Sequence, residues 1–129
     1  MSRPVPVWLV AVTATVLALA VWVLAVPVAG VDLSAGTPPQ QVGAVPVVVA
    51  TLVATLAAWG VRTLLRGRTP VLWWLTCGVV LAISLLGPLG GTSAAAVATL
   101  AALHLVVGAT VAVGLNPRRT QVRGAVPAR

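Results

Sequence analysis

Only three side chains of this chain are suited to acid–base, metal or nucleophilic chemistry, because it has a single carboxylate, imidazole and thiol: Asp32, His104 and Cys77. General acid–base work usually pairs two titratable groups, and a metal centre needs three or four ligands. No second histidine, carboxylate or thiol lies at ligand spacing from His104 on its own apolar segment. We therefore expect no catalytic, cofactor-binding or metal-binding residues, no cofactor and no enzymatic activity.

Sequence motifs support the same exclusion. The glycine-rich segment 87–91 (GPLGG) is not followed by the lysine of a phosphate-binding loop. The chain also has no GxSxG and no HExxH motif. Cys77 lies inside an apolar run and is interpreted as a small apolar filler.

The composition identifies the solvent of the elements that carry these residues. The chain is 60% hydrophobic and 7% charged, with a mean hydropathy of +1.10. Soluble domains carry about a quarter charged residues, so a lipid bilayer is expected. The net charge of +7 would suggest nucleic acid in a soluble protein, but here the arginines lie at the ends of apolar segments. Membrane lipid, not nucleic acid, is the expected partner.

Four apolar segments reach the length of about 20 residues that a helix needs to cross a bilayer. Prolines, glycines and caps predict helices over residues 7–28, 43–62, 70–87 and 93–115. An arginine in hydrocarbon costs about 2.5–3.5 kcal/mol, so the arginine-rich segment 62–68 must be a turn. The predicted fold class is an all-α, integral membrane four-helix bundle over residues 1–117, up-down-up-down, with an exposed loop at 31–41. Residues 118–129 are predicted to be a disordered, basic cytoplasmic tail.

The arginines predict the orientation. All eight basic residues are arginines, in three groups: Arg3; Arg62, Arg66 and Arg68; and Arg118, Arg119, Arg123 and Arg129. Four crossings place all three groups on one side, and each arginine favours the anionic cytoplasmic leaflet by about 1 kcal/mol. Both termini are therefore expected inside, in the cytoplasmic membrane, with Arg62, Arg66, Arg68, Arg118 and Arg119 as candidate contacts with anionic lipid. A cleaved signal peptide ending near 28–30 is the alternative, but its apolar region would exceed the usual length of about 7–15 residues.

Tryptophans and small residues predict how the helices sit and pack. Trp8, Trp59, Trp73 and Trp74 are expected to form an inner belt with wet indole N–H groups, and Trp22 is assigned to packing. Helices in lipid associate through small residues and interhelical hydrogen bonds. The small residues expected to do so are Ala94, Ala98, Ala102, Ala101, Gly108 and Ala112 on the last helix and Ala50, Ala54, Ala57 and Ala58 on the second. Eight hydroxyls are expected to bond to the carbonyl one turn back: Thr13, Thr15, Thr51, Thr55, Thr76, Ser84, Thr99 and Thr110.

His104 is the strongly polar side chain placed deepest in a predicted helix. It lies about 18 Å from the outer end at about 1.5 Å per residue, close to the midplane. Intramembrane ionisable residues are candidate functional groups for proton relay or metal binding. The alternative is a neutral ring that bonds to a neighbouring helix and fixes packing. Asp32 is expected to bond within its own turn, although it is also a candidate for cation binding or proton acceptance at the outer mouth.

Three short motifs carry a family resemblance: LAVPVAGVDL at the end of the first helix, LLGPLGG at residues 85–91 and LHLVVGA at 103–109. Together they resemble the small four-helix actinobacterial membrane proteins grouped as domain of unknown function 6069, over about residues 5–115. The resemblance implies no activity or ligand. The alanine, valine and arginine content without lysine fits a GC-rich actinobacterial source.

Two functions remain open from the sequence. The first is an interaction or structural component of the cytoplasmic membrane that binds lipid, a partner membrane protein or a second copy of itself. The second is a small transporter or channel acting as an oligomer, with His104 as its polar membrane residue. Four-helix exporters depend on a glutamate within the first helix, and this chain has none there.

Overall fold

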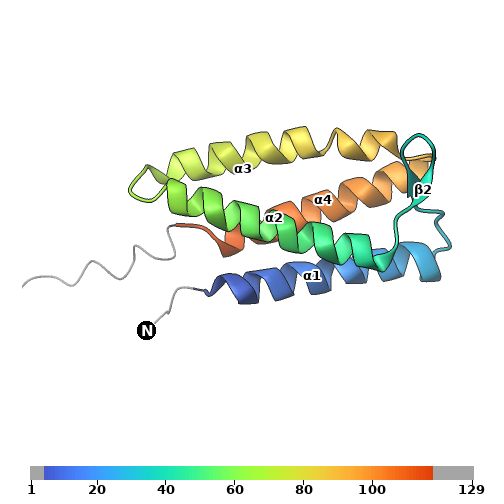
Figure 1. The fold of residues 1–129 in the computed structure, drawn as a ribbon, viewed down its shortest axis with the longest axis horizontal. Helices are drawn as coiled ribbons and strands as arrows, with labels where there is room; N and C mark the ends of the chain where they lie inside the picture. The colour runs from blue at the N-terminus through green and yellow to red at the C-terminus, as the bar shows by residue number, and fades with distance from the viewer. Residues whose placement is uncertain (1–4, 118–129) are drawn as a thin grey trace, which may run out of the picture.

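Four long helices make up most of the structure, a computed structural model that describes residues 5–117. Their bounds are Val7–Val23 for α1, Ala44–Leu64 for α2, Pro70–Ser84 for α3 and Ala94–Gly114 for α4. Consecutive helices run in opposite directions along one long axis (Figure 1). With the turns that continue them, all four are long and apolar enough to cross a membrane. The all-α, four-helix class is confirmed, while the expected tail lies outside the described residues.

The first helix ends through a wide turn. It continues into a π-helical turn, η1 (Leu24–Val28), which contains Pro27. Proline cannot donate to the helical ladder, and π turns are a common way to absorb such an irregularity. The amide of Ala29 donates to the carbonyl of Leu24, five residues back, at 3.0 Å. Gly30 then leaves the helix at a φ of 69°, which glycine adopts readily.

The turn between α2 and α3 is short and basic. α2 continues past Arg62 to Leu64, and Gly67 turns the chain at a φ of 80°. Pro70 is the first residue of α3, where a helix needs no amide donor. Thr69 occupies the N-cap position, but its hydroxyl makes no capping hydrogen bond. We call this end of the bundle, with the α2–α3 turn, the basic end.

The loops at the opposite end form a small structure of their own. Strands β1 (Ser34–Ala35) and β2 (Gln40–Gln41) pair in an antiparallel hairpin. Gly36, at a φ of 93°, donates its amide to the carbonyl of Gly90 in the 3-10 helix η2 (Gly87–Gly90). Thr92 donates to the carbonyl of Ser34 through both its amide and its hydroxyl, at 3.0 and 3.2 Å. We call this the hairpin end.

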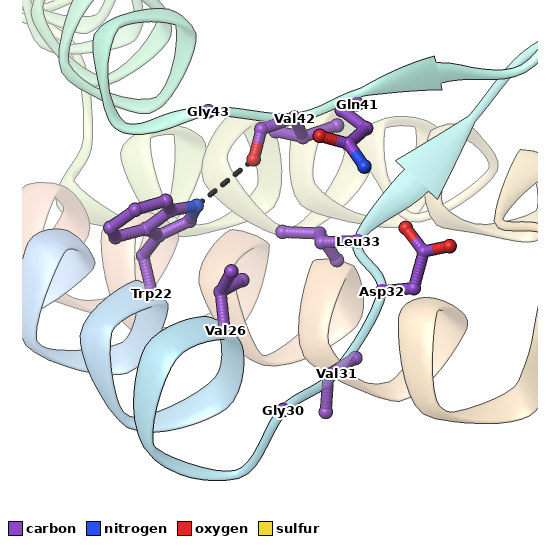
Figure 2. Close-up of a pocket in the computed structure, with 9 residues that line it drawn as sticks. All are labelled: Trp22, Val26, Gly30, Val31, Asp32, Leu33, Gln41, Val42 and Gly43. Carbon is purple, nitrogen blue, oxygen red and sulfur yellow. Dashed lines mark hydrogen bonds between the residues drawn. The ribbon is translucent and has the colours of Figure 1, made fainter.

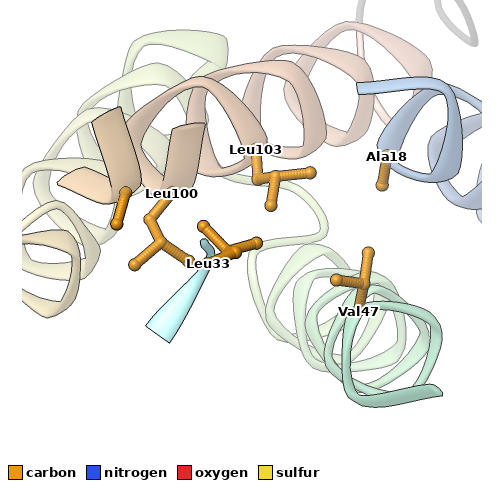
Figure 3. Packing of buried hydrophobic residues seen from close by; sticks show 6 residues of the cluster. Ala18, Leu33, Val47, Leu100 and Leu103 are labelled. Carbon is orange, nitrogen blue, oxygen red and sulfur yellow. The ribbon is translucent and has the colours of Figure 1, made fainter. Parts of the chain in front are cut away.

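The prediction of an exposed loop at 31–41 was therefore wrong in part. Leu33 is 3% exposed and Ser34 is 7% exposed. Leu33 points into the bundle and packs with Val47 and Leu103 (Figure 3). The loop is held because an apolar side chain inside it is buried, a feature that its polar neighbours conceal in the sequence.

Ser93 begins α4. Its hydroxyl accepts a hydrogen bond from the amide of Ala96 at 3.1 Å, which satisfies one of the amides at the start of the helix. The preceding residue, Thr92, bonds to the hairpin instead.

Two buried clusters hold the bundle, one towards each end. The hairpin-end cluster consists of Ala18, Leu33, Val47, Ala96, Leu100 and Leu103 (Figure 3). The basic-end cluster consists of Val10, Ala14, Trp73, Val111 and Leu115. α1 packs along both α2 and α4, whereas α3 packs along α4 and has no extended contact with α2.

The predicted hydroxyl bonds are confirmed with one exception. Seven of the eight side chains donate to a carbonyl three or four residues back, at 2.7 or 2.8 Å. The exception is Thr15, whose Oγ1 is buried without a partner among the described residues.

Candidate functional site

A groove lies between α2, α3 and α4 in the described bundle. Its volume is about 600 Å³. It exists because α2 and α3 diverge from the basic turn that joins them, while both remain against other helices (Figure 1). On α2 it extends from Pro46 to Val61, and on α3 from Trp73 to Ser84. We call it the α2–α3 groove.

The α2 side of the groove is lined by short side chains. Ala50, Ala54, Ala57 and Ala58 all line it, and the first three are exposed. They were expected to pack α2 against another helix. That expectation is confirmed for Ala58, which packs on the basic-end cluster, and was wrong for the other three, because α3 does not cover them. Close approach between helices occurs elsewhere. A Cβ on Gly108 would lie 2.8 Å from Leu81 Cδ1, and one on Gly114 would lie 2.9 Å from both Val10 methyl carbons.

The other predicted small-residue surface on α4 is also only partly used. Ala94 and Ala98 are exposed, and Ala102 is half-buried. Ala96 and Ala112 are the buried alanines of this helix. The prediction is therefore confirmed for Ala112 and for Gly108, which lies against Leu81, and was wrong for Ala94 and Ala98.

Hydroxyl groups in the groove are already hydrogen-bonded. Thr51, Thr76 and Ser84 donate to the carbonyls of Val47, Leu72 and Leu81, each at 2.8 Å. Such bonds lower the polarity of a hydroxyl in lipid. The groove wall is therefore nearly apolar along its length.

His104 is the most polar group of the groove. It is half-buried, and its Nδ1 lies 2.7 Å from the carbonyl oxygen of Leu100 on the same helix. A carbonyl only accepts, so Nδ1 carries the hydrogen and Nε2 keeps a lone pair in the neutral ring. The expected bond to a neighbouring helix was wrong, because the carbonyl one turn back is already within reach of the ring.

Trp73 closes the groove at the basic end. It is 2% exposed, and its indole N–H donates to the carbonyl of Ala112 on α4 at 3.1 Å. This carbonyl lies in the last turn of α4, where carbonyls lack helical partners. Trp73 was expected at the membrane interface with its indole N–H in water, and this prediction was wrong, because the side chain is buried. Trp8, Trp59 and Trp74 are exposed to 64%, 44% and 41%.

Three arginines lie just beyond Trp73. Arg62 is in the last turn of α2, and Arg66 and Arg68 are exposed in the turn that follows. They are the only basic residues of the described part of the chain. The groove therefore ends at a cluster of positive charge. Arg118 and Arg119, the other candidate lipid contacts, lie outside the described residues.

A smaller pocket of about 230 Å³ lies at the hairpin end (Figure 2). The indole N–H of Trp22 crosses its floor to the carbonyl of Val42 at 2.9 Å, which ties α1 to the start of α2. Trp22 also packs on the hairpin-end cluster, in agreement with its predicted packing role. Asp32 lines this pocket, and its Oδ1 accepts a hydrogen bond from the hydroxyl of Ser34 at 2.7 Å. Its side-chain bond is thus local, as expected, but goes to a side chain and not to the backbone.

The structure does not bring the candidate residues together. Asp32 lines the hairpin-end pocket and His104 lines the α2–α3 groove. Within residues 5–117 there is no group of three or more His, Cys, Asp or Glu side chains that could hold a metal ion. Cys77 is half-buried and unpaired by any disulfide. It lies in the groove wall, so its filler role is only partial.

The groove itself was not predicted. The sequence feature that could have indicated it is the row of alanines on α2. These alanines have the same spacing whether another helix packs on them or they line an open groove. Only the assembled structure shows that α3 does not pack on these alanines.

Four helices that are apolar enough to cross a membrane, around a lateral apolar groove, define a small multi-pass membrane protein. The chain belongs to the family of unknown function DUF6069, whose family model matches residues 1–121. No curated protein and no solved structure matches it significantly.

Proposed function

We propose that this protein is an interaction component of the cytoplasmic membrane, which binds lipid or a partner membrane protein through the α2–α3 groove. The observation that carries the proposal is the groove, an apolar surface of membrane-spanning helices that no described part of the chain covers. The proposal includes no catalytic activity. The amino-acid composition of the chain supports an actinobacterial source.

The charge distribution supports an orientation with the basic end in the cytoplasm. Arg62, Arg66 and Arg68 are at this end, and the only acidic residue, Asp32, is at the other. Arginines are retained on the cytoplasmic side, where anionic lipids attract them. With four crossings, both termini are in the cytoplasm as well.

Cysteine labelling tests this orientation. In a Cys77→Ala background, Gln40→Cys reports on the hairpin and Thr69→Cys on the basic turn. We expect a membrane-impermeant maleimide to label Gln40→Cys in intact cells and Thr69→Cys only after permeabilisation. Labelling of Thr69→Cys in intact cells would overturn the orientation.

Co-purification tests the interaction. The full chain, extracted in a mild detergent, is expected to retain lipid or a membrane protein in a stable complex. A monomer that retains neither, and that does not respond to added anionic lipid, would contradict the proposal.

A transporter or channel is the second candidate, because His104 lies in the wall of the groove near mid-helix. A histidine at that depth could exchange protons during transport. Proton-coupled flux in vesicles should then fall in His104→Gln, which keeps a hydrogen-bonding side chain without titration. Unchanged flux would remove this candidate, and it would not affect the interaction proposal.

A further inference from the structure

The α2–α3 groove is long enough to hold an acyl chain across one leaflet. Residues 46 to 61 of α2 span about 22 Å at about 1.5 Å per residue. One leaflet contributes about 15 Å of hydrocarbon. On α4, His104 lies about 15 Å from Gly114, so an acyl chain that lies in the groove with its head group at the basic end would extend to the depth of His104.

The walls of the groove exclude water and leave room for a narrow apolar occupant. Ala50, Ala54 and Ala57 present only methyl groups on the α2 side of the groove. Apolar cavities stay dry. The hydroxyls that line the groove are bonded within their own helices. A flexible hydrocarbon chain fits these conditions.

The charge at the basic end selects the head group. Arg62, Arg66 and Arg68 lie where the groove ends, and no acidic side chain of residues 5–117 lies at that end, because Asp32 is at the hairpin end. Guanidinium groups bind phosphate with directed hydrogen bonds. A head group with a net negative charge would be favoured over a zwitterionic one.

The same charge disfavours a second copy of the chain. Two copies inserted with the same orientation would place both sets of three arginines at the same depth, where like charges repel. An anionic lipid brings the opposite charge to that place.

We infer that the α2–α3 groove is a binding site for an anionic phospholipid, with one acyl chain between α2 and α3 and its phosphate against Arg66 and Arg68. The inference deepens the proposed function and rests on it for the leaflet, since anionic lipids are concentrated on the cytoplasmic side.

Native mass spectrometry of the full chain in mild detergent tests the site. The probes are phosphatidylglycerol and phosphatidylcholine with the same two oleoyl chains. We expect phosphatidylglycerol to bind at least about tenfold more tightly. In Arg66→Gln/Arg68→Gln this preference should vanish, whereas Arg66→Lys/Arg68→Lys should retain most of it. Equal affinity of the two lipids for the unmodified chain would overturn the inference.

A second variant separates the groove from the charged turn. Ala54→Phe places a ring in the groove and leaves the arginines unchanged, so it should lower the binding affinity for both lipids by about tenfold or more. Ala82→Phe is the matched control, because Ala82 is exposed on α3 outside the groove. Unchanged lipid binding in Ala54→Phe would show that the lipid contacts only the arginines and does not enter the groove, which would overturn the inference. A dimer lost in Ala54→Phe, without lipid selectivity, would identify a second copy as the occupant.

Photo-crosslinking covers the case in which Ala54→Phe does not fold. Phosphatidylglycerol with a diazirine in its acyl chain is added to the unmodified chain. Crosslinks should concentrate on the groove faces of α2 and α3, and crosslinks spread evenly over all four helices would contradict the site. The labelling of Thr69→Cys reports the orientation separately. If the basic turn is outside the cell but the chain still prefers phosphatidylglycerol, only the proposed orientation is overturned. If the basic turn is inside the cell but the chain shows no preference for phosphatidylglycerol, only the lipid site is overturned.

Discussion

Trp73 and Trp74 show how neighbours in the sequence receive different roles. Both stand in the first turns of a membrane-spanning helix, where tryptophan usually marks the interface. Trp74 is exposed, whereas Trp73 is buried and donates to the carbonyl of Ala112. A helix turns by about 100° per residue, so adjacent side chains face different surroundings.

Trp73→Phe should destabilise the protein by about 0.6–1.7 kcal/mol, because an interhelical hydrogen bond in lipid is lost and a carbonyl loses its donor. Trp74→Phe is the control and should have little effect. Thermal unfolding in detergent measures both. Equal stability of the two variants would mean that the indole bond contributes nothing.

Thr15→Val should leave stability unchanged or raise it by up to about 1 kcal/mol. The Oγ1 of Thr15 is buried without a partner among the described residues, and an unsatisfied buried hydroxyl is unfavourable. Thr13→Val, which removes a hydroxyl bonded to Leu9, is the comparison. A marked loss of stability in Thr15→Val alone would reveal a partner for this hydroxyl.

At the scale of the helices, association depends on a few close approaches. α4 meets α1 at Gly114 and Val10, and it meets α3 at Gly108 and Leu81. The second approach can relax because it ends on the flexible tip of a leucine. The first cannot relax easily, because both methyl groups of a β-branched valine lie against the glycine.

Gly114→Ala should therefore lower stability by about 1 kcal/mol net, since overpacking outweighs the better helix propensity of alanine. Gly60→Ala is the control, because nothing lies within 4 Å of a Cβ built there, and it should be neutral or slightly stabilising. Val10→Ala should cost less in the Gly114→Ala background than alone, as a double-mutant cycle in detergent would measure. Additive effects would contradict the contact.

At the scale of the whole molecule, charge and packing divide the bundle into two unlike ends. The basic end carries all the arginines of the described residues and begins a groove. The hairpin end is closed by β1, β2 and η2, which bond to one another across the loops. The groove opens sideways between α2 and α3, which are joined at the basic turn, so it can admit an occupant without separating the four helices.

Moving the charges should change the orientation. Replacing Arg62, Arg66 and Arg68 by Gln, together with Gln40→Arg and Gln41→Arg, is expected to give a mixed population, because the retention signal is divided between both ends. The Thr69→Cys reporter measures it in intact cells. Replacing the three arginines by Lys is the control and should keep one orientation. A single unchanged orientation in the charge-moved variant would show that these arginines do not determine topology.

The sequence alone determined the number of membrane-spanning helices, their antiparallel order and the position of the turns. These features depend on local physics: about 20 apolar residues cross a bilayer, prolines and glycines end helices, and arginines stay out of hydrocarbon. Hydrogen bonds from threonine to the preceding turn were predictable for the same reason, since both partners lie on one helix.

Only the tertiary structure decided which faces meet. The alanines of α2 line an open groove, Leu33 is buried from within a polar loop, and His104 bonds to its own helix. In a chain that is apolar on every side, the sequence carries little contrast between a face that packs and a face that meets lipid. Shape complementarity between distant segments makes that choice, and it appears only when the helices are assembled.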